Sequence, residues 1–192
     1  MNKTIGLYFG SFNPIHIGHL IIAQTIVDSD NVDEVWFVVS PQSPFKKRSS
    51  LAHEQDRYDM VQAAIFDNYK FRVTDIEFNM PKPSYTIDTL TYLREKYSDY
   101  QFKLIMGEDN LKGFHKWKNH EELISQTGII CYPRPGTRKT KWHDDDRVQM
   151  IDAPFIDISA TFIRDSVRGD KSIKYLVPKE TELLIKSRKL YD

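Results

Sequence analysis

The chain has little of what marks a secreted or membrane-spanning protein. It contains a single cysteine, Cys131, so no disulfide can form within it, and low cysteine use is typical of a reducing compartment. The apolar setting of Cys131 indicates a buried thiol rather than a nucleophile. No apolar run approaches the length of a transmembrane helix, and the first residues lack the pattern of a signal peptide. These absences predict a soluble, cytoplasmic protein that does not bind to a membrane.

Neither sign of charge prevails in the sequence. There are 27 Lys and Arg residues and 27 Asp and Glu residues among 192. This balance argues against a general electrostatic attraction to nucleic acid, although it leaves room for a local basic patch. The length suits one domain with a sizeable hydrophobic core, which we assign to residues 1–192, and the sequence does not indicate an oligomeric state.

Short apolar runs alternate with segments of helical spacing along the chain. The β-branched and aromatic runs predict strands over residues 4–8, 34–40, 71–73, 102–106, 128–132 and 149–152. Helical spacing predicts helices over residues 20–27, 51–66, 86–96, 120–126, 160–168 and 178–187, the last two in a helical C-terminal part at about 158–192. The alternation predicts the α/β class, with a doubly wound parallel sheet and helices on both faces.

The carboxyl ends of the predicted strands indicate where a ligand binds. In doubly wound sheets the ligand lies in a crevice beyond these ends, near the point where the winding reverses. We therefore expect one crevice to be lined by residues 10–19, 40–47, 107–109 and 132–136.

The most informative segment is residues 10–19, GSFNPIHIGH. It places a turn between a predicted strand and a predicted helix, with His16 and His19 where the helix begins. The backbone N–H groups of a helix start, the positive end of its dipole and two imidazole donors suit a nucleotide phosphate. Two other interpretations are that the histidines only cap and pack the helix, or that they bind zinc. Zinc needs three or four ligands, and the spacing reveals no third.

A second segment, ISATFIR at residues 158–164, has the pattern of another helix start. Ser159 and Thr161 are residue types that cap helices, and Arg164 lies one turn further on. The segment is compatible with ordinary capping beside an exposed arginine. It is equally compatible with a second helix N-terminus directed at the same anion, with Arg164 binding phosphate oxygens through its planar fork.

Three further signals surround the same crevice. The basic run at 44–48 is either a solvated loop or a site where Lys46 or Lys47 neutralises a substrate phosphate. Asp109 follows a predicted strand, so it either caps the next helix, accepts from a ribose hydroxyl or helps to hold hydrated magnesium. Trp117 has charged neighbours and is either a core residue or a surface on which a heteroaromatic ring stacks.

One acidic run is not interpreted as a metal site. Asp144, Asp145 and Asp146 lie within a highly charged stretch at residues 138–147. We interpret this stretch as a solvated, mobile loop.

Together, GSFNPIHIGH and ISATFIR resemble the nucleotidyltransferase superfamily that shares a His-x-Gly-His motif with class I aminoacyl-tRNA synthetases. Further matches are SYTIDTL, GED followed by Trp117, RPG and the ending from YLVP to LY, and these resemble the bacterial nicotinate-nucleotide adenylyltransferase family. The resemblance covers nearly the whole chain, in order. It implies a Rossmann-like fold and transfer of the adenylyl group of ATP to nicotinate mononucleotide, giving nicotinate adenine dinucleotide and pyrophosphate in NAD biosynthesis.

The resemblance also implies roles for individual residues. Catalysis would rest on His16, His19 and Arg164. ATP would be bound by Gly10, Ser11, Phe12, His16, His19, Gly107, Asp109, Ser159, Thr161 and Arg164. Nicotinate mononucleotide would be bound by Asn13, Lys46, Tyr85, Thr86 and Trp117. Mg²⁺ would be carried with the ATP phosphates and keep several waters, which suits a site with few carboxylates.

The sequence departs from the family pattern at two places. Phe9 stands where many relatives have a glycine, and Lys118 follows Trp117 where an aromatic residue is common. There are three alternatives to this function. The first is an enzyme for nicotinamide mononucleotide or another phosphorylated acceptor, the second is a nucleotide-sensing protein without turnover, and the third is a tRNA synthetase fragment. The short length argues against the last, and the presence of His16, His19 and Arg164 argues against the sensor.

Overall fold

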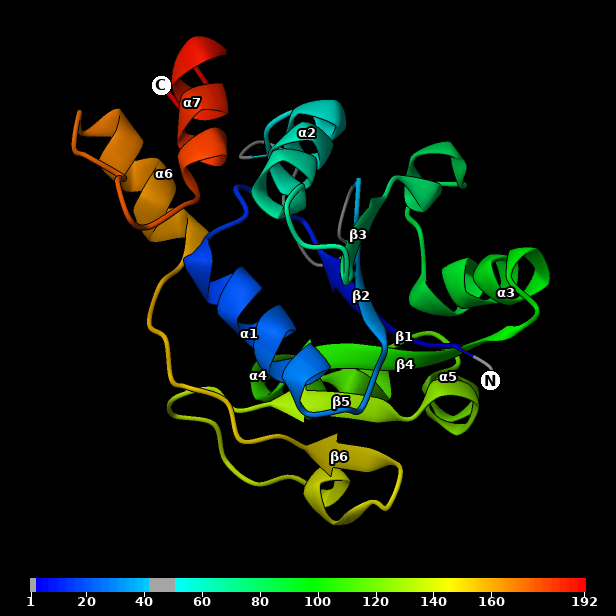
Figure 1. Ribbon diagram of the computed structural model, residues 1–192. Helices are drawn as coiled ribbons and strands as arrows, with labels where there is room; N and C mark the ends of the chain where they lie inside the picture. Colours follow the sequence, from blue (N-terminus) through cyan, green and yellow to red (C-terminus); the bar gives the residue numbers. More distant parts are fainter. Residues whose placement is uncertain (1–2, 42–50) are drawn as a thin grey trace.

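Six parallel strands form one sheet (Figure 1). The computed structural model describes residues 3–41 and 51–192. The strands are β1 (Lys3–Gly10), β2 (Glu34–Val39), β3 (Phe71–Thr74), β4 (Tyr100–Gly107), β5 (Ile129–Tyr132) and β6 (Val148–Met150). Their order in the sheet is β3-β2-β1-β4-β5-β6. The winding reverses between β1 and β4, so the predicted doubly wound parallel sheet is confirmed.

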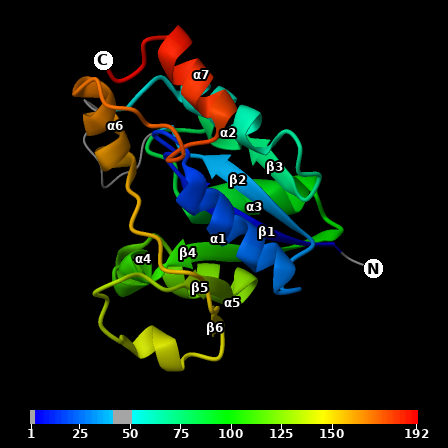
Figure 2. The same ribbon diagram turned by 60° about the vertical axis from the view of Figure 1, so that its left-hand side comes forward.

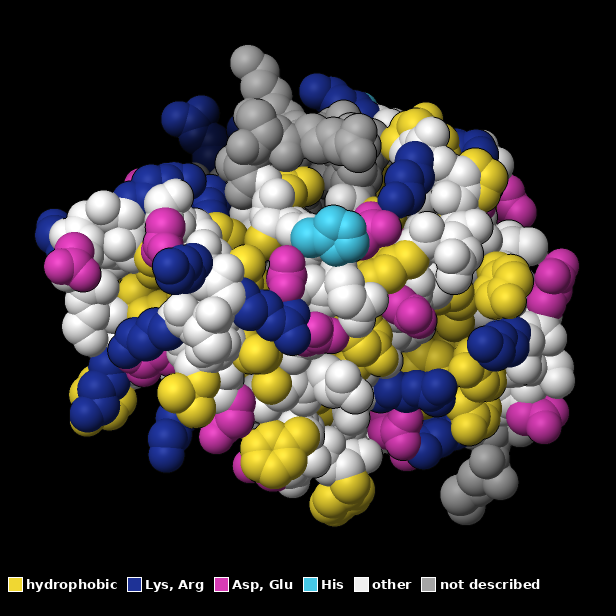
Figure 3. All heavy atoms as spheres, turned by 90° about the horizontal axis from the view of Figure 1, so that it is seen from above, with side chains coloured by type: hydrophobic (Ala, Val, Ile, Leu, Met, Phe, Trp, Pro, Cys, Tyr) yellow, Lys and Arg dark blue, Asp and Glu magenta, His cyan; other side chains and the backbone are white. Residues whose placement is uncertain are grey.

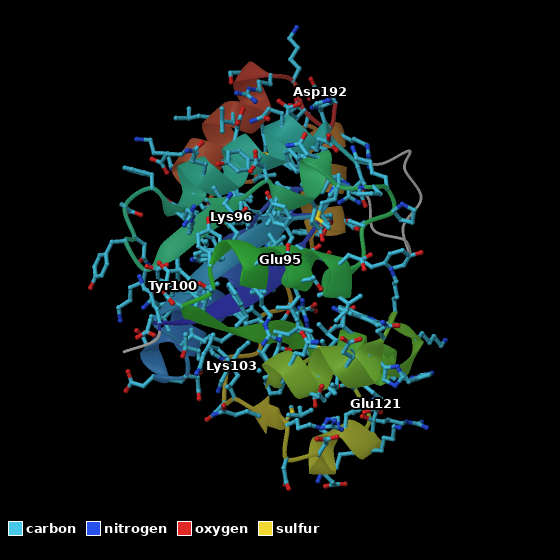
Figure 4. All side chains as sticks on the ribbon, turned by 90° about the vertical axis from the view of Figure 1, so that its right-hand side faces the viewer. Glu95, Lys96, Tyr100, Lys103, Glu121 and Asp192 are labelled. Atoms are coloured by element: carbon cyan, nitrogen blue, oxygen red, sulfur yellow. The ribbon has the colours of Figure 1, made fainter. Side chains whose placement is uncertain are left out.

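Helices cover both faces of this sheet. They are α1 (Ile17–Asp28), α2 (Glu54–Ile65), α3 (Thr86–Lys96), α4 (Glu108–Lys112), α5 (His120–Thr127), α6 (Ala160–Arg168) and α7 (Lys179–Ser187). Figures 1 and 2 show α1 and α2 on one face, with α6 and α7 continuing that layer. Figure 4, which looks onto the opposite face, shows α3 and α5 covering it.

Each face of the sheet has its own hydrophobic core, because successive strand side chains point to opposite sides. Leu7 and Trp36 point into the core under α3 and α5, whereas Tyr8 and Phe37 point into the core under α1 and α2. The run of β2 is therefore apolar throughout because both of its sides are buried. Cys131 in β5 is also fully buried, and burial raises the pKa of its thiol to about 12, as expected for a structural cysteine.

The predicted strand and helix boundaries differ from the observed ones by at most three residues, and 86–96 and 160–168 match at both ends. The helix α1 begins three residues earlier than predicted. Its first turn is closed by the backbone N–H of His16, which donates to Nδ1 of His19, so polar residues that interrupt the apolar pattern start the helix. The helix α4 was not predicted, because five residues are too few to show a helical period.

The stretch at 138–147 is largely exposed, as its charge predicts, but it contains one turn of helix and one buried side chain. A 3₁₀ helix, η4 (Lys141–Asp144), carries Trp142, which is only 3% exposed. Its ring packs edge-on against Phe114 and His120, with centroids 5.2 and 5.9 Å apart. The prediction is wrong only around Trp142, whose burial attaches the segment to the core.

The C-terminal helices are attached to the same layer as α2. Arg188 Nη1 lies 2.7 Å from a carboxylate oxygen of both Asp56 and Asp59, and the hydroxyl of Thr181 donates to the carbonyl of Met60 at 3.3 Å. Figure 3 views this side from above and shows acidic and basic side chains interspersed among apolar ones. Within the described ranges, no helix has both the length and the apolar character needed to cross a bilayer.

Candidate active site

A cleft of about 640 Å³ opens where β1, β4 and β5 end. It lies at the reversal of the winding, which is where a doubly wound sheet binds its ligand. Its lining includes most of the residues predicted to bind nucleotide: Gly10, Ser11, Phe12, Asn13, His16, His19, Asp109, Ser159, Thr161 and Arg164. The predicted crevice is therefore present, and the fold brings together segments from both ends of the chain.

His16 and His19 lie side by side at the start of α1, with ring centroids 3.7 Å apart. The backbone N–H of His16 donates to Nδ1 of His19 at 3.2 Å, so the neutral ring of His19 carries its proton on Nε2. His16 is 4% exposed, and its Nδ1 has no hydrogen-bond partner among the described residues. Buried polar atoms normally have a hydrogen-bond partner, so a bound ligand is a suitable partner for Nδ1 of His16.

The environment of His16 keeps its ring neutral. Burial, and to a lesser extent the positive charge of Arg134, lowers the pKa of His16 to about 4. Gly18 lets the ring lean against the first turn of α1, because a Cβ at this position would lie only 3.1 Å from Nδ1 of His16. At neutral pH the pair therefore offers hydrogen-bonding nitrogens rather than two adjacent cations.

The ring of Phe12 packs against the ring of His19 from the side of the core. The ring centroids of Phe12 and His19 lie 5.2 Å apart, those of Phe12 and Tyr8 lie 5.7 Å apart, and Phe12 is 2% exposed. Its backbone has a φ of 42°, in the left-handed region that few residues adopt. The turn thus sends the side chain of Phe12 into the core while its backbone borders the cleft.

Arg164 joins the two segments that the sequence singled out. Its Nη1 donates to the backbone carbonyl of Asn13 at 2.8 Å, across 151 positions of sequence, and its Nη2 donates to the hydroxyl of Thr161 at 3.1 Å. The hydroxyl of Ser159 caps α6 by accepting from the N–H of Phe162. Both predicted helix starts therefore face one cleft, and Arg164 holds them together.

The side chain of Asn13 has a structural task. Asn13 is 4% exposed, and its Oδ1 accepts from the backbone N–H of Ala52 and from the hydroxyl of Tyr191, both at 3.0 Å. Tyr191 comes from the end of the chain, so the C-terminus reaches back to the turn after β1. The position of Asn13 on the cleft agrees with the prediction, but its amide oxygen is used within the protein.

Arg134 enters the cleft from the end of β5. Its guanidinium lies 5.3 Å from the ring centre of Tyr132, and its Nε lies 3.9 Å from Oδ1 of Asp109. Gly107 lies close beside them: a Cβ there would lie 2.5 Å from Oδ1 of Asp109 and 3.0 Å from the ring of Tyr132, so a larger residue would displace these side chains. The sequence had placed 132–136 on the crevice by its strand end, but gave Arg134 no role of its own.

Arg57, which the sequence did not single out, holds the strand ends in place. It is 1% exposed and donates four hydrogen bonds of 2.6–3.0 Å to backbone carbonyls, at Ser11, Ser40, Pro41 and Ala52. Burial lowers the pKa of this arginine. No sequence signal separates Arg57 from the charged residues beside it in α2, because its role depends on carbonyl groups that only the fold assembles.

Comparison with known proteins agrees with this geometry. The cytidylyltransferase-like family model matches residues 7–166, more than half of the chain. A protein of Cytophaga hutchinsonii that carries the name "probable nicotinate-nucleotide adenylyltransferase" is 57% identical over 187 residues, which is 97% of each chain. The chain belongs to the nicotinate-nucleotide adenylyltransferase family. A member from Flavobacterium johnsoniae with the same name is 48% identical over 91% of each chain.

Solved structures of the family share the fold. The nicotinic acid mononucleotide adenylyltransferase of Plasmodium falciparum, solved in complex with NaAD, superposes with a TM-score of 0.84 and 22% sequence identity. The match covers 99% of this chain and 98% of the other. The resemblance inferred from the motifs is thereby confirmed at the level of family and fold.

Of the residues predicted to bind nicotinate mononucleotide, Asn13 lines the cleft, whereas Tyr85, Thr86 and Trp117 are not among its lining residues. Tyr85 precedes α3 and is 37% exposed, Thr86 begins α3, and Trp117 packs against the buried ring of Phe114. Lys118 forms an ion pair with Asp88 at 2.9 Å and lies 4.8 Å from the ring centre of Tyr85. Lys46 lies outside the described residues. The structure thus joins all of the residues predicted for ATP except Gly107 in one cleft, and Tyr85, Thr86 and Trp117 lie outside its lining.

Proposed function

We propose that this chain catalyses transfer of the adenylyl group from ATP to nicotinate mononucleotide, forming nicotinate adenine dinucleotide and pyrophosphate. A phosphate oxygen of the mononucleotide forms the new bond to the α-phosphorus of ATP, and the bond from that phosphorus to the oxygen bridging to the β-phosphate breaks. One observation carries the proposal: the two helix starts that bear His16, His19 and Arg164 face a single cleft in a member of this family.

The described groups suit catalysis by charge stabilisation. The attacking phosphate is already an anion, so the reaction needs positioning and donors more than a strong base. The start of α1 supplies backbone N–H groups and the positive end of a helix dipole. Next to it, Nε2–H of His19 and the buried ring of His16 supply donors whose positions are fixed before substrate arrives.

The leaving pyrophosphate would be held by the second helix start. Thr161 and Arg164 line the cleft beside the capped N-terminus of α6, where Ser159 is the capping residue. The Nε of Arg164 is buried and has no partner among the described residues, so the guanidinium has a donor left for an oxygen of the β- or γ-phosphate. Arg134, which follows β5, provides a second positive charge at the same cleft.

The remaining predicted residues complete the proposal. Gly10, Ser11 and Phe12 would offer backbone groups around the reacting phosphates, and Gly107 with Asp109 would meet the adenosine ribose. Tyr85, Thr86 and Trp117 would receive the nicotinate, with Asn13 supporting the turn between the two substrates. The protein would carry out this reaction in the cytoplasm.

Magnesium would enter the site with ATP. Within residues 3–41 and 51–192, no three His, Cys, Asp or Glu side chains are grouped so as to hold a metal ion. Asp109 is the carboxylate that lines the described cleft. This donor set fits a cation held mainly by the triphosphate and water rather than by a protein cage. Bound in this way, magnesium would neutralise charge on the phosphates that leave.

Pyrophosphate release tests the proposal most directly. The purified protein would be supplied with ATP and magnesium and, in separate reactions, with nicotinate mononucleotide or nicotinamide mononucleotide. We expect strong release with the acid form. Equal release with both would replace the proposed acceptor by either pyridine mononucleotide. Binding of ATP without release in the presence of either acceptor would overturn the proposal in favour of another acceptor or of a nucleotide sensor.

A further inference from the structure

The side chain of Glu108, the first residue of α4, makes three contacts with the segment that follows β5. Its Oε2 accepts from the backbone N–H of Arg134 at 2.8 Å and from the hydroxyl of Thr137 at 2.5 Å. Its Oε1 lies 3.0 Å from Nε2 of His143. We call Glu108, Arg134, Thr137 and His143 the Glu108 clamp. One carboxylate thus holds residues that lie 26, 29 and 35 positions further along the chain.

The hydrogen bonds of His143 indicate which tautomer of its ring fits the clamp. Nδ1 of His143 accepts from the backbone N–H of Thr140 at 3.0 Å, so the neutral ring carries its proton on Nε2 and donates it to Glu108. Burial raises the pKa of Glu108, but the three donors together outweigh it and keep that pKa below its ordinary value. The side chains of Glu108 and His143 are 15% and 7% exposed. The clamp is therefore a shielded carboxylate that only accepts hydrogen bonds.

The clamp reaches the cleft through Arg134. Its backbone is held by Glu108, while its side chain lies between Tyr132 and Asp109 and lines the cleft together with His16. Beyond it, the segment turns at Gly136, where φ is 77°, and Figure 2 shows it swinging out past α4 before it returns to the sheet as β6. The contacts of Glu108 with Arg134 and Thr137 lie at the base of this excursion.

We propose that Glu108 is a positioning residue for the adenylyl-transfer site: it fixes the backbone of the segment after β5 and so holds Arg134 at the phosphates. The kinetic part of this inference rests on the proposed function. The anchoring of the segment does not, since it follows from the contacts alone. The motif GED had suggested a role for Asp109, and the structure assigns a separate role to the residue before it.

Glu108→Gln is the informative substitution, because it keeps the size of the side chain and changes only its donors and acceptors. If the amide oxygen faces Arg134 and Thr137, the amide N–H₂ faces the Nε2–H of His143. Either two donors oppose each other, or the ring changes tautomer and gives up the hydrogen bond from the N–H of Thr140 to Nδ1. If the amide is turned over, its N–H₂ faces the backbone N–H of Arg134 instead. Neither orientation reproduces the carboxylate, so the segment is released in part.

The first measurement is limited trypsin cleavage after Arg138 and Lys139, both exposed, in the full-length protein without substrates. We expect these bonds to be cut about tenfold faster in Glu108→Gln than in the unaltered protein, because the loss of hydrogen bonds to a charged group weakens the anchoring by at least this factor. The matched control is Glu95→Gln on the exposed side of α3, labelled in Figure 4, which makes the same charge change far from the clamp. Cleavage at an unchanged rate would overturn the clamp, whatever the protein's activity.

The second measurement is a double-mutant cycle on kcat/KM for adenylyl transfer. We expect Glu108→Gln alone to lower kcat/KM by about tenfold, with the melting temperature of the protein recorded alongside. In a chain already carrying Arg134→Ala, we expect Glu108→Gln to cause no further loss. Losses that multiply would overturn the positioning role, because Glu108 would then act on the reaction independently of Arg134. Absence of transfer in the unaltered protein would instead refute the proposed function and leave the cleavage result to decide the anchoring.

Discussion

The two ends of the proposed nucleotide site are built differently. At the phosphate end, His16, Asn13 and Arg57 are almost fully buried. The side chains of Asn13 and Arg57 form hydrogen bonds to backbone groups, and the backbone N–H of His16 donates to the ring of His19. At the predicted nicotinate end, Tyr85 is exposed, and the ion pair of Lys118 with Asp88 has both side chains 45% exposed.

The difference relates to the two tasks of the proposed site, which are stabilising charge in the transition state and selecting the acceptor. Stabilising charge in the transition state requires donors that do not move, and burial with backbone hydrogen bonds provides them. Selecting between related acceptors can be done by surface side chains, which can change without disturbing the sheet. We therefore expect substitutions at the phosphate end to affect folding and turnover together, and substitutions at the nicotinate end to affect mainly the binding of one substrate.

Arg57→Met should give the largest effect on stability. It removes the four hydrogen bonds that the buried guanidinium donates to backbone carbonyl groups. We expect the free energy of unfolding to fall by about 3–5 kcal/mol, measured by urea denaturation. Arg94→Met, on the exposed side of α3, is the matched control and should change it by less than about 0.5 kcal/mol. A similar small change in both variants would show that the strand ends are held by other contacts.

His19→Ala tests the donors of the phosphate end. Loss of one fixed donor to a developing charge should lower kcat by about 100- to 1000-fold, with a smaller change in the KM for ATP. Steady-state kinetics would measure this effect. His115→Ala, at an exposed position of the 3₁₀ helix η3 (Phe114–Lys116), removes an imidazole outside the cleft and should leave kcat unchanged. An unaltered kcat in His19→Ala would remove His19 from the catalytic residues.

The buried ring of His16 predicts a dependence of stability on pH. Its pKa is about 4 in the folded protein against 6.5 for the ordinary group, so the unfolded chain binds more protons between these values. The free energy of unfolding should therefore decrease as the pH falls from about 6.5 to 4, with a contribution from His16 of at most about 3 kcal/mol. Urea denaturation over this range should show a shallower pH dependence in His16→Asn. Equal slopes in the two proteins would mean that His16 titrates normally.

Trp117→Ala should give the smallest effect and probe the other end of the site. We expect the KM for nicotinate mononucleotide to rise by about tenfold while the KM for ATP stays within about twofold, as for loss of one stacking or packing contact. Tyr92→Ala, which removes an exposed aromatic side chain from α3, serves as control. If both KM values rise together, Trp117 supports the fold through Phe114 rather than binding the acceptor, and the contrast between the two ends is weaker than proposed.

Much of the fold could be predicted because its signals are local. Apolar runs and helical spacing located β2, α3 and α6, since both depend on residues close together in sequence. The histidine motif was equally readable, because a strand end, a turn and a helix start follow one another within residues 10–19. The segment around Trp142 was missed, because its burial depends on Phe114 and His120, which another part of the chain provides.

The sequence by itself determined the parallel sheet, the crevice at its strand ends and the family, because these follow from periodicity and contiguous motifs. Only the tertiary structure decided that Arg164 meets Asn13, that Tyr191 reaches back to the same turn and that Arg57 lies buried among carbonyl groups. It also revealed the Glu108 clamp. The physical reason is the same throughout: a hydrogen bond between distant residues leaves no pattern along the chain, and its partners are known only once the backbone brings them together.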